Sequence, residues 1–302
     1  MSGSVGVRIS IGVGILVSIG VGILATLAGG APSALAAGFP SAGRTVAGAT
    51  KPPRYVIVGS TLTAPQSEFN TMGTASCPAG TATWGGGMYF ESYQIPTSSI
   101  NSSYWNGSSP GGWTVHVNNT GTGSDTVGIS AICAKKPPKY QLVSTTVDDP
   151  SGAQASGVAT CPAKTVILSG GVGSTADQAS VYLTSAYPAS ARTFQAYQYN
   201  GSSNDQPFYV YALCAAKPPG YTRTSASSTV PAGQQGVAIA DCPAKTPVIG
   251  GGIGTSVPSA AVIPVASYPQ PSAGEQPSEW VAISPNTLDV AVTVSAYAIC
   301  AN

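Results

Sequence analysis

Six cysteines are the residues whose types and spacing most clearly indicate chemistry in this chain. Three open a Cys-Pro-Ala phrase (Cys77, Cys161 and Cys242), and three close an Ala-(Ile/Leu)-Cys-Ala phrase (Cys133, Cys214 and Cys300). Six cysteines can pair in many ways, and the alternation of the two phrases favours Cys77–Cys133, Cys161–Cys214 and Cys242–Cys300. No Cys-x-x-Cys occurs, so we expect structural disulfides rather than a metal or redox centre.

Residues suited to acid–base or nucleophilic catalysis are scarce. The single histidine, His116, lies in a run of alternating polarity, and the 11 Asp and Glu residues do not recur in register. Asp148 and Asp149 precede Pro150 in a predicted turn, where they would bond to the backbone or, as a weaker alternative, bind calcium. No G-x-S-x-G or H-E-x-x-H motif occurs. We therefore expect no enzyme activity, no cofactor and no metal; a hydrolase with an atypical carboxylate site is the minor alternative.

The charge balance bears on the class of partner. Charged residues make up only 8% of the 302 residues, with 12 Lys and Arg against 11 Asp and Glu. Nucleic-acid binding needs a basic excess and is not expected. Long amphipathic helices need many charged residues and are not expected either. The hydrophobic fraction of 43% is too high for a disordered chain, so the sequence predicts a folded protein.

The N-terminal segment 1–36 has the features of an export signal. One basic residue, Arg8, precedes the apolar run Ile9–Leu27, and Ala34-Leu35-Ala36 fits a small-residue cleavage site. Cleavage after Ala36 would leave a linker rich in glycine and alanine over 37–50 and a secreted, extracellular protein. Retention of the apolar run as a membrane anchor is the alternative, and the sequence suggests no other membrane attachment.

The rest of the chain consists of three similar repeats, 51–134, 135–215 and 216–302. Each has Lys-Pro-Pro at or one residue after its start, continues through Cys-Pro-Ala and a glycine cluster, and ends just after its second cysteine. The other recurring features are the tyrosines Tyr55, Tyr140 and Tyr221, the glycine clusters at 85–87, 169–171 and 250–252, the aromatic residues Trp113, Phe194 and Trp280, and the asparagines Asn119, Asn200 and Asn286.

Each repeat predicts about six strands and no helix. In the second repeat, short runs rich in Val, Thr, Tyr and Ser are separated by Gly, Pro, Asn and Asp turns. The runs cover 139–147, 154–161, 165–173, 180–187, 192–200 and 208–214. We expect an all-β protein of three tandem, disulfide-stapled, β-sandwich-like repeats of about 80 residues each. A single pseudo-three-fold β-prism is the alternative.

The series CPAGT, GGG, Trp, Asn and AICA resembles a module that recurs in secreted, mostly uncharacterised actinobacterial proteins. The resemblance covers all three repeats and implies export and a disulfide-stapled β fold, but it implies no catalytic residue. The second repeat departs from the pattern, because Ser169 replaces the first glycine and Phe194 replaces the tryptophan. The prism alternative resembles proteins of the egg vitelline outer layer, whose repeats are shorter.

Aromatic residues that occur in only one repeat are the candidates for ligand binding. The first repeat concentrates them, with asparagines close by in sequence. Aromatic rings on a rigid β scaffold offer apolar faces to sugar rings or to a partner protein, and asparagine amides would bond to hydroxyl groups. The candidate ligand-binding residues are Trp84, Tyr89, Tyr93, Trp105, Asn101 and Asn106.

These features predict a secreted, non-catalytic protein at or near the cell surface. We expect it to bind a cell-wall glycan or another surface polymer, chiefly through the first repeat. The alternative is a structural surface or matrix component without a small ligand. Glycan binding requires the first-repeat aromatic residues to be exposed along a groove, whereas a structural role has them buried and leaves an apolar patch elsewhere. The sequence does not indicate an oligomeric state.

Overall fold

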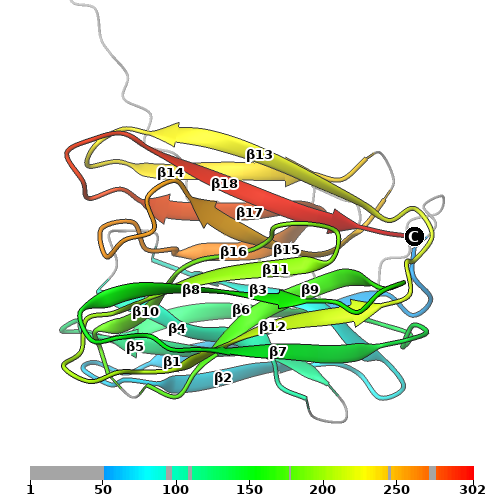
Figure 1. Cartoon of the computed structure of the whole chain (residues 1–302), viewed down its shortest axis with the longest axis horizontal. Helices are drawn as coiled ribbons and strands as arrows, with labels where there is room; N and C mark the ends of the chain where they lie inside the picture. The colour runs from blue at the N-terminus through cyan, green and yellow to red at the C-terminus, as the bar shows by residue number, and fades with distance from the viewer. Residues whose placement is uncertain (1–50, 93–96, 108–110, 177, 244–245, 272–276) are drawn as a thin grey trace, which may run out of the picture. The chain divides into compact units, whose positions relative to one another are not determined.

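Every regular element of the described residues is a β-strand (Figure 1). The structure is a computed structural model that describes residues 51–92, 97–107, 111–176, 178–243, 246–271 and 277–302; the expected export signal and linker lie outside them.

Each repeat supplies six strands, as predicted. The first repeat has β1 (Val56–Ala64), β2 (Thr71–Ser76), β3 (Ala82–Phe90), β4 (Ser98–Trp105), β5 (Gly112–Asn119) and β6 (Asp125–Ala134). The second has β7 (Gln141–Val147), β8 (Ala153–Thr160), β9 (Val166–Ser174), β10 (Val181–Pro188), β11 (Thr193–Asn200) and β12 (Phe208–Ala215). The third has β13 (Thr222–Val230), β14 (Gln235–Asp241), β15 (Val248–Thr255), β16 (Ala266–Pro271), β17 (Pro277–Pro285) and β18 (Val292–Cys300).

These strands form three six-stranded antiparallel sheets, and two repeats share every sheet. Within a repeat, the first, sixth and third strands form one layer, and the second, fifth and fourth strands form another. Each layer continues into a layer of a neighbouring repeat through the pairs β3–β16, β4–β9 and β10–β15. Sheet A has the order β1-β6-β3-β16-β17-β14, sheet B has β2-β5-β4-β9-β12-β7, and sheet C has β13-β18-β15-β10-β11-β8.

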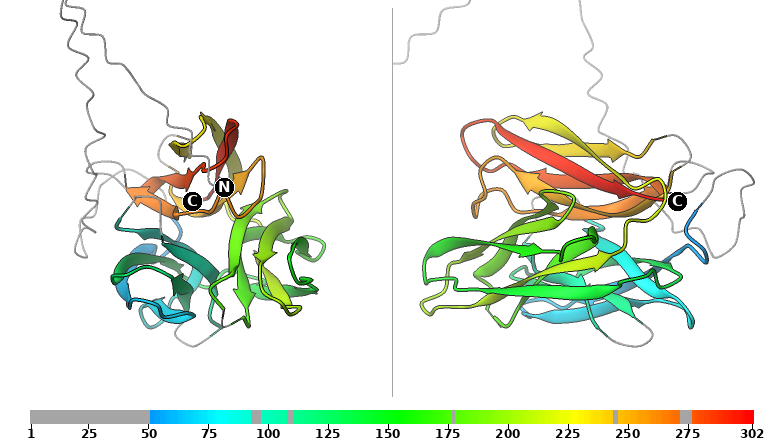
Figure 2. Two further views of the ribbon diagram at one scale, coloured as in Figure 1. Left: turned by 90° about the vertical axis from the view of Figure 1, so that its left-hand side faces the viewer. Right: turned by 45° about the vertical axis from the view of Figure 1, so that its right-hand side comes forward.

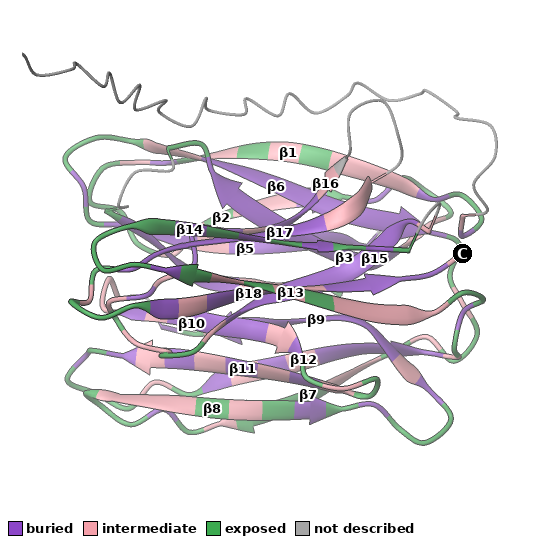
Figure 3. Cartoon of the chain, turned by 90° about the horizontal axis from the view of Figure 1, so that it is seen from above, coloured by how far each residue is buried: buried purple, intermediate pink, exposed green. Residues whose placement is uncertain are grey.

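The repeats therefore have the two layers of a sandwich without being separate modules. Sheet B joins the first repeat to the second, sheet C joins the second to the third, and sheet A joins the third back to the first. The three repeats form a closed ring, seen as the blue, green and orange-red groups of Figure 2. This is the arrangement of the pseudo-three-fold alternative. One strand of each joint, the third strand of its repeat (β3, β9 or β15), is almost wholly buried (Figure 3).

The glycine cluster allows the repeats to meet at the centre of the ring. At its first position, a Cβ on Gly85 would lie 2.5 Å from the carbonyl oxygen of Ile249 and 3.3 Å from the Cβ of Ser169. The second position makes room for the recurring aromatic ring of its own repeat. At the third, a Cβ on Gly252 would lie 2.3 Å from the carbonyl oxygen of Ala186 in the neighbouring repeat. The cluster thus serves close backbone approach.

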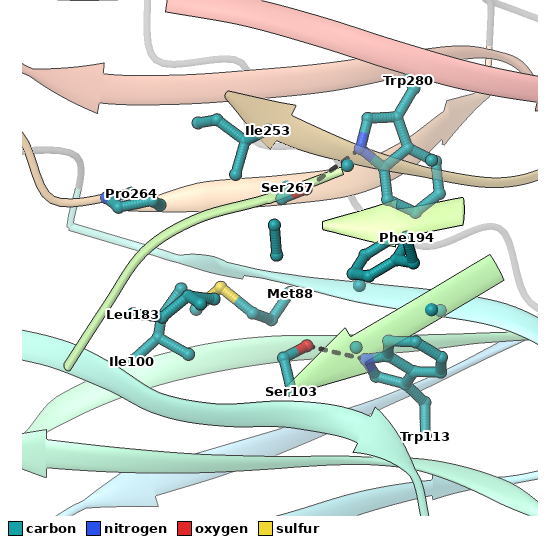
Figure 4. Close-up of a pocket in the computed structure, with 17 residues that line it drawn as sticks. Met88, Ile100, Ser103, Trp113, Leu183, Phe194, Ile253, Pro264, Ser267 and Trp280 are labelled. Atoms are coloured by element: carbon teal, nitrogen blue, oxygen red, sulfur yellow. Dashed lines mark hydrogen bonds between the residues drawn. The ribbon is translucent and has the colours of Figure 1, made fainter. Parts of the chain in front are cut away.

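The recurring aromatic residue packs in the core beneath that cluster. It is a tryptophan where a serine accepts its hydrogen bond, and a phenylalanine where an alanine replaces that serine. The indole nitrogen of Trp113 donates to Ser103 Oγ at 2.9 Å, and the indole nitrogen of Trp280 makes the same bond to a serine at 3.0 Å (Figure 4). In the second repeat, Phe194 has no N–H group, and Ala186 occupies the position of that serine. Since an unpaired buried hydroxyl costs free energy, the two changes together avoid leaving an unpaired hydroxyl group at this position.

The cavity that these rings line lies where the three sheets meet. Its volume is about 30 Å³, which is room for about one water molecule. An organic ligand does not fit there.

The recurring tyrosines link each repeat to the repeat before it. In all three, the phenol hydroxyl donates to a backbone carbonyl oxygen of the neighbour. The bonds run from Tyr140 to Thr83, from Tyr221 to Ile167 at 2.9 Å, and from Tyr55 to Val248 at 2.6 Å. The bond of Tyr55 joins the first repeat to the third and closes the ring.

The recurring asparagines hold the last hairpin of each repeat. Asn119 Nδ2 donates to the carbonyl oxygens of Ala64 at 3.0 Å and Gly123 at 2.9 Å, and its Oδ1 accepts from the N–H of Gly121. Asn200 and Asn286 are buried and make the equivalent bonds. Their recurrence therefore has a structural cause.

The three predicted disulfides are confirmed, and each joins two different sheets. The first cysteine of a pair follows the second strand of its repeat, and the other lies in the sixth strand. Cys77–Cys133 joins sheets B and A, Cys161–Cys214 joins C and B, and Cys242–Cys300 joins A and C. Disulfides of this number indicate an oxidising, extracytoplasmic environment.

A buried carboxyl group distinguishes the core of the second repeat. Asp149 is fully buried, at the position that Ala64 and Val230 occupy in the other repeats. Its Oδ2 accepts from Gln198 Nε2 at 3.2 Å, whereas its Oδ1 has no hydrogen-bond partner among the described residues. Burial raises the pKa of Asp149 to about 6, and the bond from Gln198 opposes this only in part.

Replacing Asp149 with asparagine is expected to raise the melting temperature at neutral pH. The folded carboxyl binds its proton more tightly than the unfolded one, whose pKa is 3.8. The contribution of Asp149 to stability is therefore complete below about pH 4 and is lost as the pH rises through about 6. Melting curves at about pH 8 should favour Asp149→Asn over the wild type, and the two should converge near pH 4. The exposed neighbour Asp148→Asn is the control, and an equal gain at both pH values would contradict the assignment.

Candidate functional site

The structure buries three of the residues that the sequence singled out for ligand binding. Trp84 is 3% exposed, and its indole nitrogen donates to a backbone carbonyl at 3.1 Å. Tyr89 is 8% exposed, and its ring centroid lies 5.0 Å from that of Tyr268. Asn101 is fully buried, and its amide donates to the carbonyl oxygen of Ala176 at 2.8 Å. These side chains are not available to a ligand in this structure.

The other three candidates do not complete a groove. Trp105 and Asn106 are half-buried, and the ring of Trp105 meets Tyr140 edge-on at 5.9 Å. Tyr93 lies outside the described residues. The described members of the set therefore form no exposed row of aromatic rings in the first repeat. Tyr89 covers the outer side of Gly128, because the first repeat lacks the tyrosine that the other two carry three residues before the closing cysteine.

Half-exposed tyrosines gather instead on the outer face of sheet C. In β11 the side chains alternate strictly, with Phe194 and the residues in phase with it buried and the others half-exposed. The register of β11 with β10, and of β10 and β18 with β15, places five tyrosines and one glutamine on the same side. We call this set the tyrosine face: Tyr182, Tyr187, Gln195, Tyr197, Tyr199 and Tyr297.

Ring contacts and hydrogen bonds hold this face together. Tyr187 and Tyr297 stack with centroids 4.8 Å apart and planes 14° apart, on either side of Gly254. The hydroxyl of Tyr187 donates to Gln195 Oε1 at 3.3 Å, and Gln195 Nε2 donates to the hydroxyl of Tyr197 at 2.6 Å. The glutamine thus fixes two neighbouring tyrosines in place, so little side-chain freedom remains to be lost on binding.

A second ring pair extends the row along the same strands. Tyr182 and Tyr199 lie with centroids 5.4 Å apart. Burial, together with the neighbouring phenol groups, raises the pKa of Tyr182 and of Tyr187 to about 12. Both hydroxyls therefore stay protonated at neutral pH and can donate as well as accept hydrogen bonds.

The tyrosine face is electrically neutral. Strands β8, β10, β11, β15 and β18 contain no Asp, Glu, Lys or Arg, and the one charged residue in the strands of sheet C is Arg223 of β13. The guanidinium group of Arg223 donates to the carbonyl oxygen of Pro188 at 3.1 Å. A ligand of this face would therefore be recognised without an ion pair.

The other repeats show that the scaffold does not require tyrosine at these positions. Tyr197 lies three residues after the recurring aromatic residue, where the first repeat has His116 and the third has Ile283. Gln195 corresponds to Thr114 and Val281 by the same spacing. Of the residues of the tyrosine face, only Tyr187 has a tyrosine at the equivalent position of both other repeats, Tyr104 and Tyr268. Tyr187 lies at the joint between repeats, next to Gly252. The tyrosines at 182, 197 and 199 are particular to the second repeat.

The alternation of apolar residues and tyrosines in the sequence of β11 could have indicated the tyrosine face. The sequence TFQAYQYN places its apolar residues and its tyrosines on opposite sides of a strand. The first repeat was favoured because it concentrates the aromatic residues that occur in only one repeat, but large rings are also the side chains that a shared core buries most readily.

The described part of the chain has neither a metal-binding cluster nor a membrane-spanning helix. It contains no group of three or more His, Cys, Asp and Glu residues placed to hold a metal ion. No described helix is long and apolar enough to cross a membrane.

No protein-family model matches the chain, and no curated protein is similar to it.

Proposed function

We propose that this is a secreted, non-catalytic protein that binds a neutral polysaccharide through the tyrosine face of sheet C. The observation that carries the proposal is the group of five half-exposed tyrosines on one side of sheet C, held by ring pairs and by the two hydrogen bonds of Gln195. Sugar rings have an apolar C–H face that gains by packing on an aromatic ring. Their hydroxyl groups match the donors and acceptors of tyrosine and glutamine.

Export supports the same function. The N-terminal signal pattern, with cleavage after Ala36, would deliver the chain to the oxidising compartment that the disulfides require. The resemblance to secreted actinobacterial modules agrees with a place at the cell surface. The protein would there meet cell-wall and environmental polysaccharides.

A structural role in a surface or matrix layer is the second candidate, and one observation favours it. Val237 and Ile239 of the edge strand β14 are 46% and 41% exposed. They lie opposite Ile283 and Val281 on the outer face of sheet A. Exposed aliphatic side chains along an edge strand favour contact with another protein surface.

Co-sedimentation of the purified protein with insoluble cellulose, chitin and cell-wall sacculi tests polysaccharide binding. The variant Tyr197→Ile with Tyr199→Asn gives the second repeat the residues that the third and first repeats carry at these positions. We expect it to keep its melting temperature and to bind at least about tenfold more weakly, the loss typical of removing a contact residue at the centre of an interface.

The control is Val237→Thr, which removes an exposed apolar side chain from a different sheet and should leave retention unchanged. Polyanions such as heparin should be retained poorly, because the one basic residue in the strands of sheet C, Arg223, already donates to the carbonyl oxygen of Pro188. Failure of the wild type to bind any of the three polymers would overturn the proposal. Equal loss of retention by the control would favour the structural role.

A further inference from the structure

A second row of stacked rings lies on the outer face of sheet B. The rings run across the sheet from His116 of β5 through Tyr104 of β4 to Tyr211 of β12, and then along β12 to Tyr209. The centroid distances between neighbours are 5.8, 5.6 and 6.2 Å, and the planes of neighbouring rings differ by 24°, 28° and 23°. All four side chains are half-exposed. We call this set the sheet B row.

The sheet B row is fixed in place and neutral, like the tyrosine face. Nδ1 of His116 lies 2.6 Å from Asn70 Oδ1, its Nε2 lies 3.3 Å from the hydroxyl of Tyr104, and the ring of Tyr211 covers Gly173. Burial lowers the pKa of His116, so the imidazole is uncharged at neutral pH. None of the six strands of sheet B contains Asp, Glu, Lys or Arg.

The two rows face away from each other. The inner faces of all three sheets supply the side chains around the central cavity, among them Trp113 from sheet B, Phe194 from sheet C and Trp280 from sheet A (Figure 4). The outer faces of sheets B and C therefore point outward in different directions, and one extended polymer lying on sheet C does not run along sheet B. Each row would take its own polymer chain.

Resting on the function proposed above, we infer that the protein is a bivalent cross-linker that holds two strands of neutral polysaccharide, one on sheet C and one on sheet B. Sheet A provides no third row, because its tyrosines Tyr89 and Tyr268 are only 8% and 6% exposed. Two sites on one body bind a polymer network more firmly than either site alone. The protein would then stiffen or compact the polymer layer to which it binds.

The test uses sheared cell-wall fragments and chitin microcrystals as probes, with binding measured by co-sedimentation and clustering by light scattering. The wild type should bind and should cluster the particles, with less clustering when protein is in large excess. Tyr209→Ser carries the residue of the third repeat and weakens the sheet B row, and Tyr197→Ile with Tyr199→Asn weakens the tyrosine face. Each variant should still bind, with clustering reduced at least about tenfold, and the combined variant should not bind.

The outcomes separate the two proposals. Absence of wild-type binding overturns the proposed function itself. Binding without clustering overturns only the cross-linking inference. Undiminished clustering by Tyr209→Ser also overturns it, since self-association would then supply the second site. Particle clustering by Val237→Thr at the wild-type level is expected and serves as the control.

Discussion

Replacing Gly251 with alanine is expected to lower the free energy of unfolding of the whole protein sharply. A Cβ at this position would lie 2.2 Å from the Cδ2 atom of Trp280 and 2.3 Å from the carbonyl oxygen of Tyr297. Neither neighbour can yield, because the indole is fixed by its bond to Ser267 and the carbonyl belongs to the adjacent strand. Overpacking of this kind costs roughly 3 kcal/mol, a large part of the stability of an ordinary domain.

Urea denaturation, or the yield of soluble protein when the loss is complete, measures this effect. Gly123→Ala is the matched control, because a Cβ there would meet no atom within 4 Å, and it should behave like the wild type. An unfolding midpoint of Gly251→Ala within error of the wild type would contradict the role that we assign to the glycine cluster.

The second large effect concerns the disulfide Cys161–Cys214 of the second repeat. Replacing both cysteines with alanine opens a loop between residues 53 apart, which is expected to cost roughly 4 kcal/mol. Because each sheet is shared by two repeats, we expect the loss to lower the stability of the entire ring. All spectroscopic probes should report one earlier transition.

The distribution of tryptophan allows this test to distinguish unfolding of the whole ring from unfolding of the second repeat alone. Trp84, Trp105 and Trp113 lie in the first repeat, Trp280 lies in the third, and the second repeat has none. Tryptophan fluorescence therefore follows only the repeats that keep their disulfides. A shift of the fluorescence midpoint equal to the shift seen by circular dichroism would show that the repeats unfold together. An unshifted fluorescence transition would show that they unfold independently.

The local features of the fold could be predicted because the repeats supply three examples of each. A cysteine, glycine cluster or asparagine that recurs in register has a structural cause, and the disulfides and the strands followed from that recurrence. The joints between repeats could not be predicted in the same way. The pairing of β4 with β9 involves Ser103 and Val172, and nothing in either strand distinguishes a partner in the neighbouring repeat from one in its own.

The candidate site was the less predictable part. Strand sequences show which residues share a side, but the side that faces water depends on where the neighbouring layer lies. Trp84 and Tyr89 are particular to the first repeat for packing reasons, and Tyr197 and Tyr199 are particular to the second while remaining half-exposed. Uniqueness within a repeat set therefore does not identify surface groups by itself, because only burial separates side chains that fill the core from side chains that are exposed.

The hydrogen bond from Tyr55 to the carbonyl oxygen of Val248 gives the molecule a property that its linear sequence conceals. The same contact joins each repeat to its predecessor, so the three repeats are cyclically equivalent. A circular permutant that reads second, third and first repeat would form the same sheets, the same disulfides and the same joints. The order of the repeats along the polypeptide is therefore arbitrary with respect to the fold. Mutations can give any one of the three outer faces a function of its own without disturbing the structure that the other two share.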